Sequence, residues 1–597
     1  MRRSPLGEVV EVRTDRVVIR LREYAKSAVI AHADGLSSVG QPGDLIGIDS
    51  GSYLLIARIS TITMYDAGYA PGNRTSPTSL RSLEAQVIGV LTREHGSLAF
   101  SSDRTRLPAL GGQAVGLTHE ETCAVLDPVV DVEDDEPILL GSSVSTYPVP
   151  VKVGLNPLLA RHFAVLGSSG QGKTHFVTSI LQRLVQAGPR ARIVIFDVHD
   201  EYGTAFRGLE GVNLKETVIG TPQVGDGREH YKIPYYALGR TGIGRLILPS
   251  EKTQRPALNF AMDKLPFVDG DLSSARLVGQ PHPTLYDDCR TEGAFAAATA
   301  IQSLKENAAP AAQQWPPMKA LSCLAAEWAA LEHYQGNWRR SAFNYGNVGW
   351  MLQRMNRLIE DARFNQIVST GASLPLQVPG SLSMANESTE LIRRIFGGTG
   401  PENWNVHIVT LKQLPSDLAP HILGSLLELF AEQLFVRGPG NTHPTLLVLE
   451  EAHQYLREIP GDAETGKHAL AYERLAREGR KFPVSMMISP QRPSEVSPTV
   501  LALCGSWAIF RLTNEKDQSV ISSGTEQASK YATAQIPGLV RGQAVIFGDA
   551  MPLATKLKVV RPIAGFEPKS NDAQFARAWR AATAAPAMPF PLIPPQS

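Results

Sequence analysis

The spacing of hydrophobic and polar positions changes several times along the 597-residue chain. In the first part, apolar and polar residues alternate in short bursts at residues 9–21, 45–59 and 85–91, with Gly, Ser, Asp and Pro between them. A period of two is typical of half-buried strands, so several short strands at this spacing predict a small β-barrel or sandwich. Residues 66–82 are rich in Gly, Ser, Pro and Asn, which predicts an exposed loop within it.

Strand and helix patterns alternate from Tyr147 onward. An apolar strand, a Gly-rich turn and an amphipathic helix are followed by ARIVIFD, residues 191–197, which is almost continuously apolar. Such strands are typical of parallel sheets covered on both faces, and the alternation predicts a doubly wound α/β core. The alternation resumes after about residue 402 with the strand NVHIVTLKQL, a helix from about Asp417 to Val436, and the strands TLLVLE, PVSMMIS and SWAIFRL.

Strand signals fade between these two parts. Ala-rich stretches at Glu292–Lys305 and Ala320–Tyr334 predict a helical insertion there. After Pro562 the pattern predicts one short amphipathic helix near Phe575–Trp579 and a Pro-rich end. The sequence thus predicts five segments: a β-barrel (1–146), the first part of the α/β core (147–239), a helical insertion (240–401), the second part of the core (402–562) and a C-terminal tail or brace (563–597).

Composition restricts the possible classes of protein. Hydrophobic residues make up 43% and charged residues 19%, as in ordinary globular chains. Lys plus Arg and Asp plus Glu are 58 each, so any DNA that is bound must meet a local positive surface, such as a pore. No signal peptide or membrane-length apolar run is visible, which predicts a cytoplasmic protein with no membrane partner. The cysteines lack CxxC spacing, which predicts reduced thiols rather than a zinc site: Cys123, Cys289, Cys323 and Cys504.

The segment GSSGQGKT fits the phosphate-binding pattern GxxxxGK[ST] between a predicted strand and a predicted helix. Glycines let backbone N–H groups surround phosphates, and the helix N-terminus presents its positive dipole end to them. Lys173 is expected to reach the β- and γ-phosphates, and the Thr174 hydroxyl to bind Mg²⁺. ATP and Mg²⁺ are the predicted cofactors, and the predicted nucleotide-binding residues are Gly167, Ser168, Ser169, Gly170, Gln171, Gly172, Lys173 and Thr174.

Two carboxylates follow the apolar run LLVL at Glu450 and Glu451. Ligands of open α/β sheets bind at the carboxyl ends of strands, where a P-loop needs a carboxylate for its metal. We expect Glu450 to support Mg²⁺ through water and Glu451 to act as general base on the attacking water. The alternative is that both acids cap the following helix. The interval 450 − 173 = 277 residues exceeds what a compact nucleotide-binding core requires, in agreement with an insertion.

The segments GSSGQGKT, FDVHDEY, EEAHQYL, REGRKF and SPQRPSEVSPTVL, in this order, resemble the HerA branch of the HerA/FtsK ATPases. The resemblance covers residues 147–262 and 402–562, and the N-terminal strands resemble the HAS-barrel of this family. It implies a RecA-like P-loop core of the additional-strand class. It also implies a homohexamer with DNA in the central pore and ATP between subunits. Family members work as DNA translocases beside a nuclease, or as motors of anti-phage defence systems paired with another effector.

The same resemblance implies roles for residues outside the P-loop. Arg480 in GRKF resembles the arginine finger that reaches the neighbouring subunit's γ-phosphate, with Arg477 as the second candidate. By itself, this segment is more typical of a basic helix end stabilised by the dipole, but its position between EEAH and the next strand favours the finger. Gln491 occupies the position of a polar sensor near the γ-phosphate.

The motif DVHDEY, residues 197–202, departs from the DPHGEY usual in the family at Val198 and Asp200. This leaves the roles of Asp197, His199 and Glu201 open. The HxE pair lacks a third ligand at convincing spacing, so a dedicated zinc site is not predicted.

The expected function is an ATP-hydrolysing hexameric DNA translocase or helicase whose effector, a nuclease or an NAD-cleaving sirtuin-like enzyme, is on another chain. The alternative is an ATP-binding ring scaffold that assembles and switches an anti-phage effector with little translocation. A conjugation or secretion ATPase is disfavoured by the N-terminal barrel and the lack of membrane segments. Basic residues in or near the insertion are weak candidates for DNA contact: Lys232, Arg339, Arg340, Arg393 and Arg394.

Overall fold

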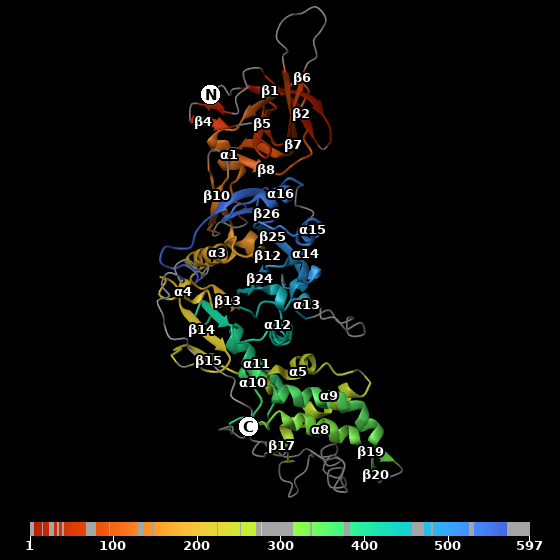
Figure 1. Ribbon diagram of the computed structural model, residues 1–597. Helices are drawn as coiled ribbons and strands as arrows, with labels where there is room; N and C mark the ends of the chain where they lie inside the picture. The colour runs from red at the N-terminus through yellow and green to blue at the C-terminus, as the bar shows by residue number, and fades with distance from the viewer. Residues whose placement is uncertain are drawn as a thin grey trace, which may run out of the picture.

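The computed structural model describes residues 5–14, 16–22, 29–32, 35–38, 41–66, 79–94, 96–128, 130, 136–144, 148–223, 225–250, 252–269, 276–277, 314–334, 337–374, 382–456, 471–478, 481–524, 530–569 and 579. The described chain is elongated (Figure 1), with a barrel at one end, a large sheet in the middle and a helical region at the other end. Within this part of the chain, no helix is long and apolar enough to cross a membrane.

The N-terminal strands close into the predicted barrel. The strand order is β2-β1-β9-β5-β6-β7, and β2 also pairs with β7, which closes the ring. Alternate side chains such as Val9, Ile19 and Ile46 point inward and form its core, as the period-two pattern predicts. The strands are β1 (Pro5–Val12), β2 (Val17–Leu21), β5 (Leu45–Asp49), β6 (Tyr53–Asp66), β7 (Ser79–Glu94) and β9 (Gln113–Gly116), with β8 (Ser97–Ser101) beside β7 and a separate hairpin of β3 (Val29–His32) and β4 (Gly35–Ser38).

The middle of the molecule is a 12-stranded mixed sheet of order β11-β10-β27-β26-β25-β12-β24-β23-β13-β22-β14-β15. Neighbours are parallel from β25 to β15 and antiparallel from β25 back to β11. The parallel strands are β12 (His162–Leu166), β13 (Arg192–Asp197), β14 (Leu214–Ile219), β15 (Glu229–Tyr231), β22 (Val406–Thr410), β23 (Thr445–Glu450), β24 (Val484–Ser489) and β25 (Cys504–Ile509). The remaining strands are β10 (Ile138–Ser143), β11 (Pro150–Val153), β26 (Gln543–Gly548) and β27 (Thr555–Val559).

The apolar strands of the sheet are buried on both faces. In β13, Ile193 and Ile195 pack into one core, while Val194 and Phe196 pack into the other. Helix α3 (Lys173–Ala187) covers the first face, and α5 (Gly239–Ile247), α11 (Met384–Phe396) and α12 (Ala419–Arg437) belong to the second core. This confirms the predicted doubly wound α/β core. Strand β24 lies between β12 and β23, which is the additional strand of the predicted class.

The helical end contains α6 (Gln254–Lys264), α8 (Lys319–Ala330), α9 (Ala342–Glu360) and α10 (Ala362–Ile367), as Figure 1 shows. The predicted helix Ala320–Tyr334 is wrong at its end, because β19 (Leu331–Tyr334) pairs with β20 (Asn337–Arg340) in a hairpin. The stretch Glu292–Lys305 lies outside the described residues. Because α5 and α11 share a core with α12, part of the predicted insertion packs directly on the sheet, and the five-segment division stays a prediction.

Shorter elements complete the described chain. They are α1 (His119–Val125), α2 (Leu155–Leu159), α4 (Gly203–Phe206), α13 (Ala471–Glu478), α14 (Pro498–Ala502), α15 (Glu515–Gly524), α16 (Lys530–Gln535), β16 (Ile233–Pro234), β17 (Val268–Asp269), β18 (Arg276–Leu277), β21 (Val368–Ser369), and the 3₁₀ turns η2 (Tyr235–Leu238), η3 (Leu265–Phe267), η4 (Ala452–Gln454), η6 (Pro493–Glu495) and η7 (Ile536–Gly538).

The segment after β27 packs on its own subunit. The Gln182 side chain of α3 donates to the Phe566 carbonyl oxygen at 2.8 Å and accepts from the Ile563 N–H at 2.9 Å. The Lys569 N–H donates to the Glu201 carbonyl oxygen at 2.8 Å. The first residues of the predicted tail therefore lie against α3 and the turn after β13, whereas the predicted helix at Phe575–Trp579 lies, except for Trp579, outside the described residues.

Candidate nucleotide site

The loop 167–172 connects β12 to α3 at the carboxyl edge of the sheet. Gly170 and Gly172 have φ values of 74° and 102°, a region that favours glycine, and Gly172 is the N-cap of α3. A Cβ atom at Gly167 would lie 2.5 Å from the Phe510 Cβ, so this position also needs glycine. Lys173 and Thr174 are the first residues of α3, whose N-terminal N–H groups lack helical partners and suit an anion.

The Lys173 side chain is buried within this loop. Its ammonium donates to the carbonyl oxygens of Gly167 at 2.5 Å and of Ser168 at 3.2 Å. Burial lowers the pKa of Lys173 to about 8, while the nearby carboxylates of Glu451 and Glu450 oppose that shift. Phosphate oxygens in the loop would replace the two carbonyl acceptors and favour the charged ammonium.

Glu450 is the last residue of β23 and is fully enclosed. Its Oε2 has no hydrogen-bond partner among the described residues. Burial raises its pKa, and the negative charges of Asp197, Glu201 and Glu451 raise it further. Several carboxylates thus lie near the buried Glu450 Oε2, which lacks a hydrogen-bond partner in the described part of the chain. A divalent cation would suit this position, because it would stabilise the ionised form of Glu450.

The described residues contain no cluster of three His, Cys, Asp or Glu side chains able to hold a metal ion alone. A Mg²⁺ ion here would therefore depend on the Thr174 hydroxyl, water and substrate phosphates in addition to Glu450. Binding through few protein ligands is usual for Mg²⁺ at nucleotide sites.

Glu451 follows Glu450 in a left-handed conformation, with φ of 48°. Strain of this kind in a non-glycine residue concentrates at functional sites. Its carboxylate accepts a hydrogen bond from the Gln491 side chain, which comes from the loop after β24. Two imidazoles also face it: His199 Nε2 lies 3.6 Å from Oε1, and His453 Nδ1 lies 3.3 Å from Oε2.

The two imidazoles differ in their electrostatics. The nearby Glu451 carboxylate is the main cause that raises the pKa of His199, whereas burial lowers the pKa of His453. His453 was not among the predicted site residues, although its position two residues after Glu451 in EEAH was the available signal. The structure thus places Lys173, Glu450, Glu451 and Gln491 around one edge of the sheet, as their positions after strands predicted.

Two arginines are the predicted candidates for the arginine finger. Arg477 lies exposed in the last turn of α13, where its Nε donates to the Glu473 carbonyl oxygen of the same helix at 3.4 Å. Arg480 lies outside the described residues. Both assignments stay predictions.

The candidate DNA contacts near the insertion already have partners. Lys232 donates to the Asn365 carbonyl oxygen at 2.6 Å. Arg393 pairs with Glu390 at 2.8 Å, and Arg394 pairs with Glu229. Arg339 and Arg340 belong to β20, where the backbone alone is described.

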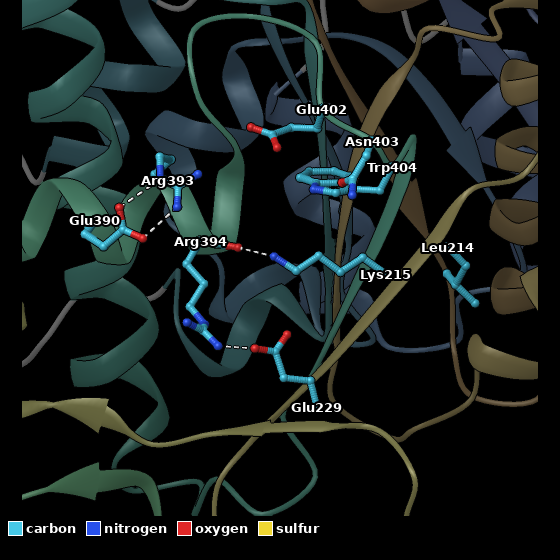
Figure 2. Close-up of a pocket in the computed structure, with 9 residues that line it drawn as sticks. All are labelled: Leu214, Lys215, Glu229, Glu390, Arg393, Arg394, Glu402, Asn403 and Trp404. Carbon is cyan, nitrogen blue, oxygen red and sulfur yellow. Dashed lines mark hydrogen bonds and ion pairs between the residues drawn. The ribbon is translucent and has the colours of Figure 1, made fainter.

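Figure 2 shows the arginines Arg393 and Arg394 in a cleft of about 480 Å³ near the amino ends of β14 and β22. Three cationic and three anionic side chains line it, so it offers no net positive charge to a phosphate backbone. The lining residues are Leu214, Lys215, Glu229, Glu390, Arg393, Arg394, Glu402, Asn403 and Trp404.

Comparison with known proteins connects these features to one family. Residues 138–309 match the family described as "Helicase HerA, central domain". The chain is 22% identical over 431 residues to the DNA double-strand break repair helicase HerA of Pyrococcus furiosus, covering 71% of this chain and 69% of that one. It is 23% identical over 513 residues to the protein of the same name from Sulfolobus acidocaldarius, covering 84% of each chain. The chain therefore contains a HerA central domain and is similar to HerA helicases over most of its length.

Two solved structures align with most of this chain at low sequence identity. VirB4 of Thermoanaerobacter pseudethanolicus aligns with a TM-score of 0.46 and 15% identity over 73% of this chain and 99% of that one. The plasmid coupling protein TrwB in complex with ADP and Mg²⁺ aligns with a TM-score of 0.38 and 12% identity, over 73% of this chain and 98% of that one.

Proposed function

We propose, from the HerA central domain that this chain contains, that the protein is an ATP-hydrolysing motor that moves along or unwinds DNA. The observation that carries the proposal is the meeting of the P-loop, Glu450, Glu451 and Gln491 at the carboxyl edge of one parallel sheet. The two HerA relatives are named as DNA double-strand break repair helicases, which supports DNA as the substrate of the motor.

The residues of the site divide the work of hydrolysis among them. The N–H groups of the P-loop and the Lys173 ammonium bind the phosphates, and the Thr174 hydroxyl and Glu450, through water, hold Mg²⁺. The metal neutralises charge on the phosphate oxygens when bound. Glu451 accepts a proton from the attacking water, and Gln491 holds one oxygen of that carboxylate while remaining close enough to sense the γ-phosphate.

Assembly is the further part of the proposal. We infer a homohexameric ring with DNA in its pore, in which Arg480 of one subunit completes the nucleotide site of the next. A positive group at this position stabilises charge that develops on the transferred phosphoryl group. The effector, a nuclease or an NAD-cleaving enzyme used in antiviral defence, is proposed to be a separate chain.

The test is to measure ATP hydrolysis by the purified protein with and without duplex and single-stranded DNA, and displacement of a protein roadblock from the DNA. A motor shows DNA-stimulated turnover and ATP-dependent displacement. Turnover that no DNA stimulates, with no displacement, would contradict the motor. Full effector activity in a Glu451→Gln ring would then favour the ring scaffold.

A further inference from the structure

The turn Val198–Tyr202 after β13 lies beside Thr174, a candidate metal ligand, and beside Glu451, the candidate general base. The His199 imidazole lies 3.6 Å from the Glu451 carboxylate, from Nε2 to Oε1. The Thr174 hydroxyl lies near the Glu201 carboxylate and opposes the rise in the pKa of Glu201 that burial causes. Two side chains of one five-residue turn therefore lie near two groups on separate elements, Thr174 at the start of α3 and Glu451 after β23.

Asp197 fixes the path of this turn. Its fully buried carboxylate accepts hydrogen bonds from the N–H groups of His199 and Glu201 at 3.2 Å each, and of Tyr202 at 3.0 Å. These three hydrogen bonds fix the backbone of the turn against the Asp197 carboxylate. The side chains of His199 and Glu201 are consequently presented on one rigid support.

Contacts on the outer side anchor the same turn. Asp200, with φ of 62°, pairs with Arg228 at 2.6 Å and lies 3.9 Å from the Lys412 ammonium. The Glu201 carbonyl oxygen accepts from the Lys569 N–H at 2.8 Å. Asp200, one of the two departures from the family motif, thus forms an ion pair that restrains the turn away from the phosphate side.

We propose that the turn Val198–Tyr202 positions the hydrolytic groups: His199 orients the Glu451 carboxylate, and Glu201 orients the Thr174 hydroxyl. This inference rests on the proposed ATPase function. Misplacement of a reacting group by about 1 Å can lower a rate by about 10²-fold. Partners that orient metal ligands typically contribute about 10- to 100-fold in metal affinity or activity. Both residues are therefore positioning residues that act through another side chain.

The first experiment compares His199→Ala with His199→Gln in steady-state ATP hydrolysis. His199→Ala lowers kcat by about 10-fold with little change in KM, because the substrate contacts remain while Glu451 loses one partner. Glutamine can place an amide N–H near the position of Nε2 and restores most of the rate. The matched control is His443→Ala, since His443 contacts the Arg190 carbonyl oxygen before β23 and its loss leaves both constants unchanged.

The second experiment measures binding rather than activity. Mg²⁺ is titrated calorimetrically into the full chain saturated with a non-hydrolysable ATP analogue. Glu201→Ala weakens Mg²⁺ binding by about 10-fold because the Thr174 hydroxyl loses its neighbouring carboxylate, and Glu201→Gln weakens it less because its amide oxygen can still accept a hydrogen bond from that hydroxyl.

The outcomes separate this inference from the proposed function. The positioning role alone is overturned by one combination of results. In it, the wild-type protein hydrolyses ATP, His199→Ala has an unchanged kcat, and Glu201→Ala has an unchanged Mg²⁺ affinity. Loss of nucleotide binding in both His199 variants also overturns the positioning role, because the turn is then needed for folding of the site. A wild-type protein that binds ATP and never hydrolyses it overturns the proposed function and the positioning role together.

Discussion

Glu451 is restrained by several contacts in the candidate site. It has a left-handed backbone, accepts from Gln491 and faces two imidazoles, while its own N–H donates to the Ser489 carbonyl oxygen at 2.9 Å. A carboxylate held from several sides has little freedom to leave the position in which it would meet the attacking water. This favours its role as general base over that of a helix cap.

Glu451→Gln is expected to bind ATP with nearly unchanged affinity and to hydrolyse it at least about 10²-fold more slowly, because the amide cannot accept the proton of water. Equilibrium binding of a labelled ATP analogue and single-turnover hydrolysis measure the two quantities. The control is Glu216→Gln on β14, which removes the negatively charged partner of the exposed Arg207. Normal hydrolysis in Glu451→Gln would move the catalytic role to another residue.

A second single residue, His162, is expected to make the stability of the folded protein depend on pH. Its Nδ1 accepts from the Met486 N–H at 3.1 Å and its Nε2 faces the Ala476 carbonyl oxygen at 3.0 Å, so the folded state needs the neutral ring. Burial lowers the pKa of His162 to about 4. Because the unfolded ring has a pKa of about 6.5, its contribution is complete above that pH and is lost as pH falls from about 6.5 to about 4, on the order of 3 kcal/mol.

The expected result is that the free energy of unfolding falls between pH 7 and pH 5 and that this fall is smaller in His162→Asn. Urea titrations at both pH values measure it. An identical pH dependence in the variant and the wild-type protein would show that His162 does not titrate on unfolding.

At the scale of elements, the site depends on how closely the P-loop packs against the end of β25. Gly167 follows β12, and Phe510 follows the neighbouring β25, which pairs with β12 through Leu166 and Ile509. The Phe510 ring also packs edge-on against Phe176 of α3, with ring centroids 5.6 Å apart. Any atom added at Gly167 therefore displaces either the loop or this aromatic support of α3.

Gly167→Ala is expected to weaken ATP binding by at least about 10-fold, because a Cβ 2.5 Å from the Phe510 Cβ must shift the loop. The control is Gly346→Ala in α9, where a Cβ meets no atom within 4 Å and alanine is preferred in a helix. Calorimetric titration with an ATP analogue compares the two. Equal affinities would mean that the loop accommodates the methyl group without loss.

At the scale of the whole molecule, the barrel and the sheet are directly linked. The Arg58 guanidinium of β6 donates to the Ala554 carbonyl oxygen beside β27 at 2.6 Å, and Leu553 packs against apolar clusters of both parts. Within the site, Lys173 supplies one positive charge beside Glu450 and Glu451. A neighbouring subunit is the proposed source of the second positive charge.

The test of this arrangement mixes Arg480→Ala subunits with Lys173→Ala subunits. Alone, Arg480→Ala retains ATP binding and loses about 10³-fold in hydrolysis, while Lys173→Ala loses nucleotide binding. Mixed rings contain interfaces with an intact P-loop on one side and an intact Arg480 on the other, so ATPase activity returns. If subunit exchange is confirmed and activity stays absent, Arg480 acts within its own subunit or is misassigned, and Arg477 is the next residue to vary.

The sequence by itself determined the local elements and the chemistry at their ends. Continuous apolar runs produced the buried strands, and period-two alternation produced the barrel, because both patterns depend only on which side chains avoid water. The P-loop and the Glu450–Glu451 pair were visible for the same reason, since their residues are contiguous. Local pattern failed at Leu331–Tyr334, where pairing with β20 overrode the helical signal of the preceding residues.

Only the tertiary structure decided which strands and turns became neighbours. Gln491 meets Glu451 because β24 lies beside β23, and His199 meets Glu451 because β13 lies on the other side of β23. The pairing of Asp200 with Arg228 across 28 residues was equally invisible in the motif. The order of strands in a parallel sheet is set by crossover connections and by packing of helices on both faces, so a pattern read along the chain cannot specify it.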